Sequence, residues 1–499
     1  MRPENNLAAL AAIFWLSSGV ISALAGESLD EWLDRAADPV LSRREREFAS
    51  RQVLMLADDS ASIIVSALAE RDPGKRLRRQ AAARLLGELA LPEAEAPLIE
   101  AFFAEDPILS ETAGAALAKL YSRLDPANLS RLLSQDKPIA AGFPPPPGSG
   151  LDDWLSLSLA GSGSTERFRA VVMRAIAVKY ARTGGLDQRL LPQVLACLSN
   201  GGTELRIWSV QAAALSGEAA AAEKIVTLLY YETHPGLLIQ ALRFLAESRL
   251  AAYLPAAERQ AAHADPLVAI EALAALAALG YGGAVFPPGP GARSIAGYIH
   301  HPSTPVRRRA IELLGLSRNP AAIEYLEAAL FDRVGANRAA AVRALAKIGF
   351  AGLAGSLSPL LRDGRPEVRT EAAIALAGMG VVGVTARVLE DLAGESPPFR
   401  RAAARSLGAM GDARAIPALL EALEDQDLEL ACLAAESLGE MAGKELGANL
   451  FARLVSRGNP VLADAIRLAL RKIYQDDPGD SPGAWGSWAR RNRLSGGSP

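Results

Sequence analysis

Histidine and cysteine are the residues best suited to binding a metal or attacking a substrate, and the chain has few of either. They are His234, His263, His300, His301, Cys197 and Cys432. Adjacent residues cannot share one face of a helix, so the His300–His301 pair is a poor metal site without accompanying thiols or carboxylates. Each cysteine stands alone, as expected of a small core residue. Serine-nucleophile motifs and phosphate-binding loops are also missing, and we predict no catalytic, metal or cofactor site.

Arginine forms the clearest charged pattern. Its members are Arg79, Arg307, Arg338, Arg369 and Arg400, the last four at intervals of 31 residues. One interpretation is a basic stripe that binds an acidic partner or polyanion. The favoured one is structural: each arginine bonds a carboxylate or carbonyl of the preceding helix junction, where Asp332 and Asp363 precede Arg338 and Arg369 by six residues. A net charge of −3 provides no overall field for nucleic acid.

Aromatic residues are concentrated in the segment LLYYETHPG. Its candidate partner-binding residues are Trp208, Tyr230, Tyr231 and His234. Aromatic residues make up only 5% of the chain, and large rigid aromatics are typical anchors of protein interfaces. The alternative is that they fill space left by an irregular repeat.

The elements that must position these residues repeat along the chain. A run of small and aliphatic residues returns every 31 residues in the C-terminal half, as in AAAVRALAKIG and AAARSLGAMG. Its anchors are Leu56, Gly87, Ala118, Val178, Ser216, Ala246, Ala277, Gly315, Ala346, Ala377, Gly408, Gly439 and Leu470. A fixed period of this size indicates a solenoid of about thirteen repeats.

Each repeat reads as a helical hairpin. Residues 398–411 form one apolar-periodic helix and residues 415–425 a second, with Pro417 in the first turn and glycines such as Gly349 and Gly411 at helix ends. High Ala and Leu content suits closely packed helices. The predicted fold is therefore an all-α superhelix over residues 26–474, followed by a tryptophan-containing cap and flexible tail at 475–499.

Pro/Gly-rich loops interrupt the period. GFPPPPGSG lies at 142–150 and VFPPGPGARS at 285–294. Consecutive prolines cannot be helical, so we interpret both as extended loops between helices. The region 138–150 is the one candidate hinge, and its prolines could instead serve as a polyproline II ligand.

The N-terminus resembles an export signal. Leu7 to Ala25 is apolar and ends in Ala23-Leu24-Ala25, a pattern typical of signal-peptide cleavage. We predict an exported protein, periplasmic in a Gram-negative source, with residues 1–25 removed. The alternative is an uncleaved membrane anchor, because 19 apolar residues almost span a bilayer.

The unit FRRAAARSLGAMGDARAIPALLEALED resembles a HEAT repeat of the short bacterial, phycobilisome-lyase type. The resemblance is strong over about 305–470 and weaker back to about 45. Some proteins with such repeats are di-iron hydroxylases that use His-Glu dipeptides, which this chain lacks, and others are bilin lyases. The ending DDPGDSPGAWGSWARRN resembles the cap of many bacterial HEAT proteins, with Trp485 and Trp488 on one helical face.

The sequence favours a non-catalytic exported scaffold or adaptor that binds protein partners along a concave surface. We expect the second helix of each repeat to form that surface, with Glu324, Glu327, Glu421 and Glu424 as candidate exposed positions. The alternatives are a lyase-like enzyme or enzyme subunit, which needs polar side chains converging in the groove, and an envelope polyanion binder, which needs arginines lining it.

Overall fold

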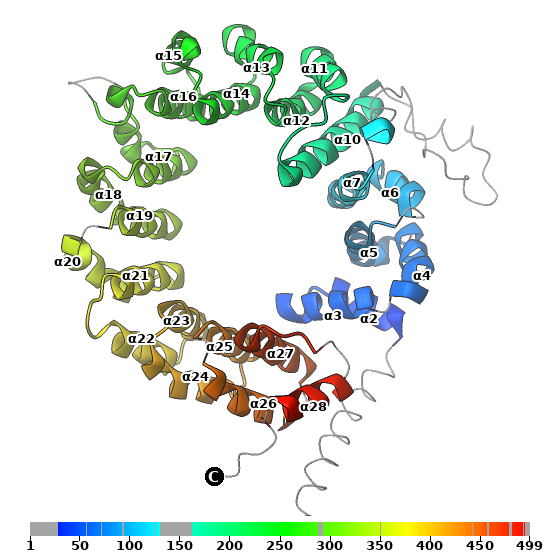
Figure 1. Ribbon diagram of the computed structural model, residues 1–499, viewed down its shortest axis with the longest axis vertical. Helices are drawn as coiled ribbons and strands as arrows, with labels where there is room; N and C mark the ends of the chain where they lie inside the picture. The colour runs from blue at the N-terminus through cyan, green and yellow to red at the C-terminus, as the bar shows by residue number, and fades with distance from the viewer. Residues whose placement is uncertain are drawn as a thin grey trace, which may run out of the picture. The chain divides into compact units, whose positions relative to one another are not determined.

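The computed structural model describes residues 28–129, 162–287, 293–478 and 482–494, apart from positions 56, 71, 92–93, 125, 350, 442, 457–458 and 493. Every regular element in these ranges is helical (Figure 1). The predicted signal segment 1–25, the candidate hinge 138–150, residues 288–292 of the loop 285–294 and the SGGSP tail lie outside the described residues. None of the described helices is long and apolar enough to cross a membrane.

The described residues divide into two compact units, one of residues 28–297 and the other beginning at Tyr298. The boundary directly follows the Pro/Gly loop 285–294. Helices of the first unit are α2 (Leu29–Ala37), α3 (Arg43–Met55), α4 (Ala57–Ala69), α5 (Arg76–Leu89), α6 (Glu95–Phe102), α7 (Pro107–Tyr121), α10 (Ser162–Thr183), α11 (Leu191–Asn200), α12 (Thr203–Ala214), α13 (Ala219–Tyr231), α14 (Pro235–Ser248), α15 (Leu254–Gln260) and α16 (Pro266–Ala278).

The second unit continues the same alternation. Its helices are α17 (Thr304–Ser317), α18 (Ile323–Ala329), α19 (Gly335–Ile348), α20 (Ala354–Leu357), α21 (Pro366–Gly378), α22 (Val384–Leu392), α23 (Pro397–Met410), α24 (Ile416–Ala422), α25 (Leu428–Met441), α26 (Gly447–Ser456), α27 (Pro460–Tyr474) and α28 (Pro482–Arg491). The all-α solenoid predicted from the repeats is confirmed.

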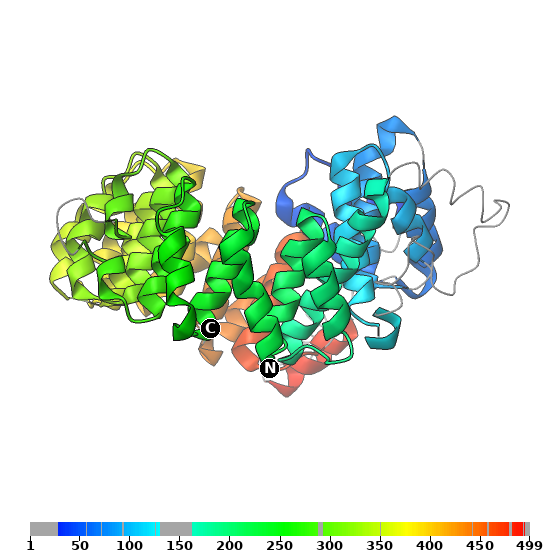
Figure 2. The same ribbon diagram turned by 90° about the horizontal axis from the view of Figure 1, so that it is seen from above.

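The helices of each unit form two layers. The first layer contains α3, α5, α7, α10, α12, α14 and α16 in one unit and α17, α19, α21, α23, α25 and α27 in the other. The second layer contains the shorter helices between them. First-layer helices pack directly against one another, whereas second-layer helices touch each other little. Figure 2 shows helices of the first unit, in green, lengthwise and side by side.

The concave side of each unit is lined by the first layer, and the second layer covers the convex side (Figure 1). The expectation that second helices form the concave surface is therefore wrong. Its physical reason lies in the anchor residues. A Cβ on Gly315 would stand 2.6 Å from the Cβ of Ala344, and one on Gly408 would stand 2.6 Å from the Cβ of Ser437. Only small residues permit this approach, and closely spaced first helices make that layer the inner side of the curve.

Other glycines end helices, as predicted. Gly349 and Gly411 follow α19 and α23 with φ values of 76° and 67°, the left-handed conformation that glycine adopts without a Cβ clash. Pro417 lies in the first turn of α24, where the absent N–H costs no hydrogen bond.

The chain's last described helix closes the stack of repeats. Trp485 and Trp488 of α28 are buried, and the indole N–H of Trp488 donates to Asp476 at 2.8 Å. The ring of Tyr474 packs edge-on against Trp488 with centroids 4.9 Å apart. These contacts cover the apolar end of α27.

Candidate protein-binding surface

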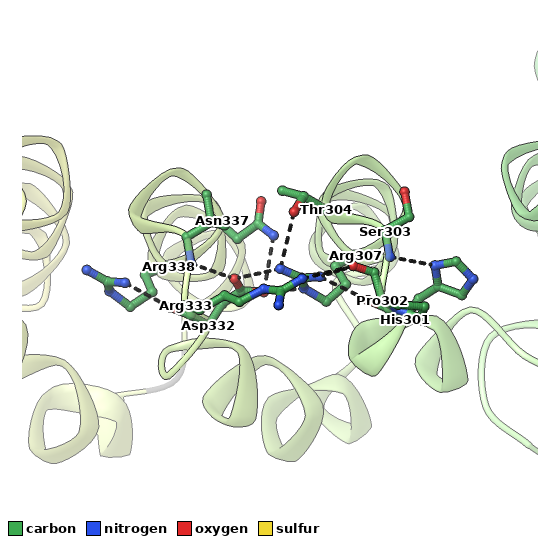
Figure 3. A network of polar contacts seen from close by, with 10 residues as sticks. His301, Pro302, Ser303, Thr304, Arg307, Asp332, Arg333, Asn337 and Arg338 are labelled. Carbon is green, nitrogen blue, oxygen red and sulfur yellow. Dashed lines mark hydrogen bonds and ion pairs between the residues drawn. The ribbon is translucent and has the colours of Figure 1, made fainter.

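The arginine ladder crosses the junctions between repeats. Arg307 of α17 donates from Nε to Asp332 Oδ2 at 2.6 Å and from Nη2 to Asp332 Oδ1 at 3.1 Å (Figure 3). Its Nη1 also donates to the carbonyls of His301 and Pro302 at 2.9 and 3.0 Å. Arg338 repeats the arrangement with Asp363, at 2.8 and 2.7 Å. Each arginine thus joins two consecutive junctions.

Burial and hydrogen bonding compete at the ladder carboxylates. Burial alone would raise the pKa of Asp332, but bonds from Arg307, from the Val334 N–H and from Asn337 outweigh it and lower the pKa to about 2. The same bond to Asp332 raises the pKa of Arg307. Both side chains are nearly inaccessible, 7% exposed for Arg307 and 5% for Asp332. The pair is a fixed structural element that no partner could reach.

The structural interpretation of the ladder is correct, with one change of partner. The preceding junction supplies carbonyls, such as Asp332 O to Arg338 at 2.8 Å and Leu68 O to Arg79 at 3.0 Å. Carboxylates, in contrast, come from the following junction, 25 residues after the arginine in Arg307–Asp332. One guanidinium bonds to carbonyls of the preceding junction and to a carboxylate of the following one. The ladder therefore couples neighbouring repeats rather than closing each repeat on itself.

Sequence reasoning missed a ladder arginine in the first unit. Arg206 of α12 donates to the Leu198 carbonyl at 3.0 Å and pairs with Glu232 at 2.6 Å. The irregular spacing between Val178 and Ser216 takes Arg206 out of phase with the others. A search for an acid 26 residues after an arginine at the start of a helix would have found this pair.

Two histidines occupy positions where other repeats carry the ladder carboxylate. The arginine that would pair with that carboxylate is missing as well. Glu232, His263, His301 and Asp332 follow one another at 31, 38 and 31 residues, the longer step containing the 285–294 loop. The Nδ1 of His263 accepts the Asp265 N–H at 2.9 Å, as Asp332 accepts the Val334 N–H at 2.8 Å. His301 likewise accepts the Ser303 N–H at 3.1 Å.

The arginine positions of the same repeats are apolar. Leu238 and Ala269 stand six residues after Glu232 and His263, where Arg307 and Arg338 follow His301 and Asp332. Both are fully buried. A carboxylate at 263 or 301 would find an apolar side chain in the place of its ladder arginine, whereas an imidazole accepts the backbone N–H without adding a negative charge. These histidines therefore have a structural explanation, and the described residues hold no group of three His, Cys, Asp or Glu arranged for a metal.

Exposed side chains of both signs follow the concave face of the second unit. Glu312 of α17 has one equivalent in each following repeat, at steps of 31 residues. These equivalents are Arg343, Ile374, Arg405, Glu436 and Arg467. Some pair across the layer, as Arg343 does with Glu371 at 2.6 Å. The ladder arginines take no part in this row, because they lie buried at the junctions. The surface thus carries mixed charge rather than a single basic stripe.

The four glutamates predicted for the concave surface lie on the other side. Glu324 and Glu327 belong to α18 and Glu421 to α24, both second-layer helices, and Glu424 lies in the turn that directly follows α24. Glu327 accepts from Ser356, and Glu424 pairs with Arg453 at 3.3 Å. These two acids tie neighbouring second-layer helices together, so they serve the convex layer.

The predicted aromatic cluster is divided between two layers. Trp208 of α12 is half-buried, with the Arg174 guanidinium of α10 5.2 Å above its ring. Tyr230 and Tyr231 end α13 and are 39% and 82% exposed. They line a hollow of about 320 Å³ beside Arg259. The tyrosines remain available as an anchor, whereas Trp208 already contributes to packing within the first layer.

His234 and the two cysteines are held by local contacts. The Nδ1 of His234 accepts the Gly236 N–H at 3.2 Å and caps α14. Cys197 and Cys432 are both buried and neither forms a disulfide, and burial raises the pKa of the Cys197 thiol despite the nearby Arg169. A thiol in this state is a weak nucleophile.

Comparison with protein families agrees with this geometry. The family model described as HEAT repeats matches residues 293–377 and 385–471. These matched residues are HEAT repeats. The matched HEAT repeats coincide with the regular part of the ladder, from Arg307 to Arg400. No curated protein matches the sequence.

Several solved structures resemble the HEAT solenoid weakly. A Kap95p–RanGDP structure is 14% identical with a TM-score of 0.38, covering 93% of this chain and 70% of that one. The CpcE–CpcF complex of phycocyanin lyase from Nostoc sp. PCC7120 is 16% identical with a TM-score of 0.28, covering 56% and 94%. Human deoxyhypusine hydroxylase is 18% identical with a TM-score of 0.22, covering 57% and 96%. At these values neither activity nor partners pass from those proteins to this chain.

Proposed function

We propose that this chain is a non-catalytic scaffold or adaptor that binds a protein partner along the concave face of its first-layer helices. The carrying observation is the row from Glu312 to Arg467, in which Glu312, Arg343, Arg405 and Glu436 are exposed, presented on helices that the ladder holds in register. A repeat array offers many weak contacts in a fixed geometry, which suits an extended protein surface.

The distribution of charge supports a protein partner over a polyanion. A polyanion binder needs cations concentrated along one groove. Here Arg307 and Arg338 already pair with Asp332 and Asp363, and the row on the first-layer helices contains both arginines and glutamates. A mixed surface matches the mixed polar surface of another protein.

We further propose that the protein is exported, on the basis of the apolar segment ending at Ala25. Replacing Ala23 and Ala25 with Asp should block cleavage and leave a longer, membrane-associated chain. N-terminal sequencing of the wild-type protein from its source should then begin at Gly26. A native chain that begins at Met1 in the soluble cytoplasmic fraction would contradict export.

Site-specific photocrosslinking in the source cells tests the binding proposal. A benzoylphenylalanine placed at Ala346 of α19 or Ala409 of α23 stands on the exposed concave face, and one at Ala386 of α22 or Ala448 of α26 stands on the second layer. We expect one reproducible protein adduct, identified by mass spectrometry, from the two concave positions and little from the other two.

The four positions are all exposed alanines, so the probes differ mainly in the layer they occupy. Adducts from Ala386 and Ala448 alone would move the binding surface to the convex side. A failure to crosslink any protein from the concave positions, with the full chain present and folded, would refute the scaffold function.

A further inference from the structure

A hollow of about 310 Å³ opens on the concave face between α17 and α19. Its floor consists of Gly315, Ala340 and Ala344. The hollow exists because these residues are small, and it lies over the closest approach of the two helices, where a Cβ on Gly315 would meet Ala344. Leu316 at its edge is 61% exposed, an unusual exposure for a large apolar side chain.

The rim of this hollow is basic. Arg309, Arg343 and Lys347 face a single acid, Glu312. Glu312 lies 3.6 Å from Arg309, a long contact between partly exposed groups. Arg343 pairs with Glu371 outside the hollow, and no carboxylate in the described ranges pairs with Lys347. The rim therefore carries an excess of positive charge beside an exposed apolar side chain.

Three repeats further on, the same positions carry the opposite charge. Steps of three times 31 residues lead from Arg343 to Glu436 and from Lys347 to Glu440, both on α25. Both glutamates are exposed. Glu440 has one exposed neighbour, Lys472, at 3.4 Å. With 8–10 Å between neighbouring helices, the two charged positions lie roughly 25–30 Å apart.

We infer that this face binds an extended protein segment in which an acidic stretch with one apolar side chain is followed, about eight residues away, by a basic stretch. The inference rests on the proposed function and names the partner's chemistry. The acidic stretch pairs with Arg343 and Lys347, its apolar side chain contacts Leu316, and the basic stretch pairs with Glu436 and Glu440. About eight extended residues span this distance at roughly 3.3 Å each. Opposite charges at the two ends fix the register of the bound segment.

Fluorescence anisotropy with synthetic peptides tests this directly on the full chain. The main probe is a fluorescein-labelled peptide with four acidic residues around one leucine, eight Gly/Ser residues, and four lysines. Two comparison peptides carry acidic residues at both ends or lysines at both ends. Wild-type protein should bind the acidic–basic peptide fivefold to tenfold more tightly than either, since two exposed charge pairs are gained, and the preference should fade at high salt.

Charge reversal should change the preference in a set direction. The variant E436K/E440K should prefer the peptide that is acidic at both ends, and R343E/K347E the peptide that is basic at both ends. K347E alone removes no ion pair present in the described structure, so a shift in that variant cannot come from a broken ion pair. The control E324K/E421K reverses two acids on the second layer and should leave all affinities unchanged.

Each other result has a distinct meaning. Equal binding of the three peptides by wild-type protein, or preferences that the reversals leave unaltered, would overturn the inference while leaving the crosslinking test of scaffold function intact. Tighter binding of the doubly acidic peptide by wild type would overturn it in favour of a polyanion. Sedimentation that shows a dimer lost in R343E/K347E would overturn it in favour of a second copy of the chain.

Discussion

Replacing Asp332 with Asn tests how much the ladder contributes to stability. Asn keeps an oxygen that accepts the Val334 N–H but removes the charge that pairs with Arg307. An ordinary aspartate pKa of 3.8 and a folded value of about 2 differ by an amount worth roughly 2.5 kcal/mol at neutral pH. We expect Asp332→Asn to lower the free energy of unfolding at pH 7 by at least about that much, because it also leaves a buried guanidinium without its counter-charge.

The effect has a defined dependence on pH. Because folding lowers the pKa of Asp332, its contribution is complete above pH 4 and is lost as the pH falls through about 2. At pH 3 roughly half should remain, so wild type and variant should differ less there than at pH 7.

Urea unfolding followed by far-ultraviolet circular dichroism measures both values. Glu324→Gln removes an exposed carboxylate from the same unit and is the matched control, with no expected change at either pH. Equal stability of wild type and Asp332→Asn at pH 7, or a difference that stays constant down to pH 2, would refute the ladder's role.

Three further predictions concern packing, and thermal unfolding checks each of them. Gly315→Ala should destabilise the protein by up to about 2 kcal/mol, since overpacking against Ala344 exceeds the gain in helix propensity. Gly378→Ala, where a Cβ would meet nothing within 4 Å, should stabilise it by up to about 1 kcal/mol. Stabilisation by both substitutions would contradict the close approach of α17 and α19. His263→Asp should cost roughly 1 kcal/mol at pH 7 and His263→Asn almost nothing, because only Asp adds a charge, and Leu238 stands in the place of the ladder arginine; equal costs would contradict the histidine explanation. Trp488→Ala should cost about 3–5 kcal/mol through loss of the buried cap, and an unchanged midpoint would show that α28 does not seal the stack.

The fold could be predicted because the same packing requirement returns in every 31-residue repeat. Each helical hairpin has an apolar face that only its neighbours can cover, so the period alone indicates stacking. The identity of the concave layer was missed, although a signal was present. Gly315, Gly408 and Gly439 mark helices that approach most closely, and the most closely spaced layer lies on the inside of a curve.

The surface was less predictable than the fold because its features depend on registers that insertions disturb. Arg206 and Glu232 form a ladder pair that the irregular spacing before Ser216 hid. His263 and His301 occupy positions for acids, which a search for carboxylates passes over. Arg343 and Glu436 show opposed charge only when repeats are aligned on their anchors, since their sequence neighbours are unremarkable.

Hydrogen exchange on the full chain, alone and with the partner that the concave probes capture, tests the central claim most directly. Slower exchange on binding should concentrate in the first-layer helices, with α17, α19 and α25 among the most protected. Protection confined to second-layer helices such as α18, α22 and α24, with the first layer unchanged, would contradict the account.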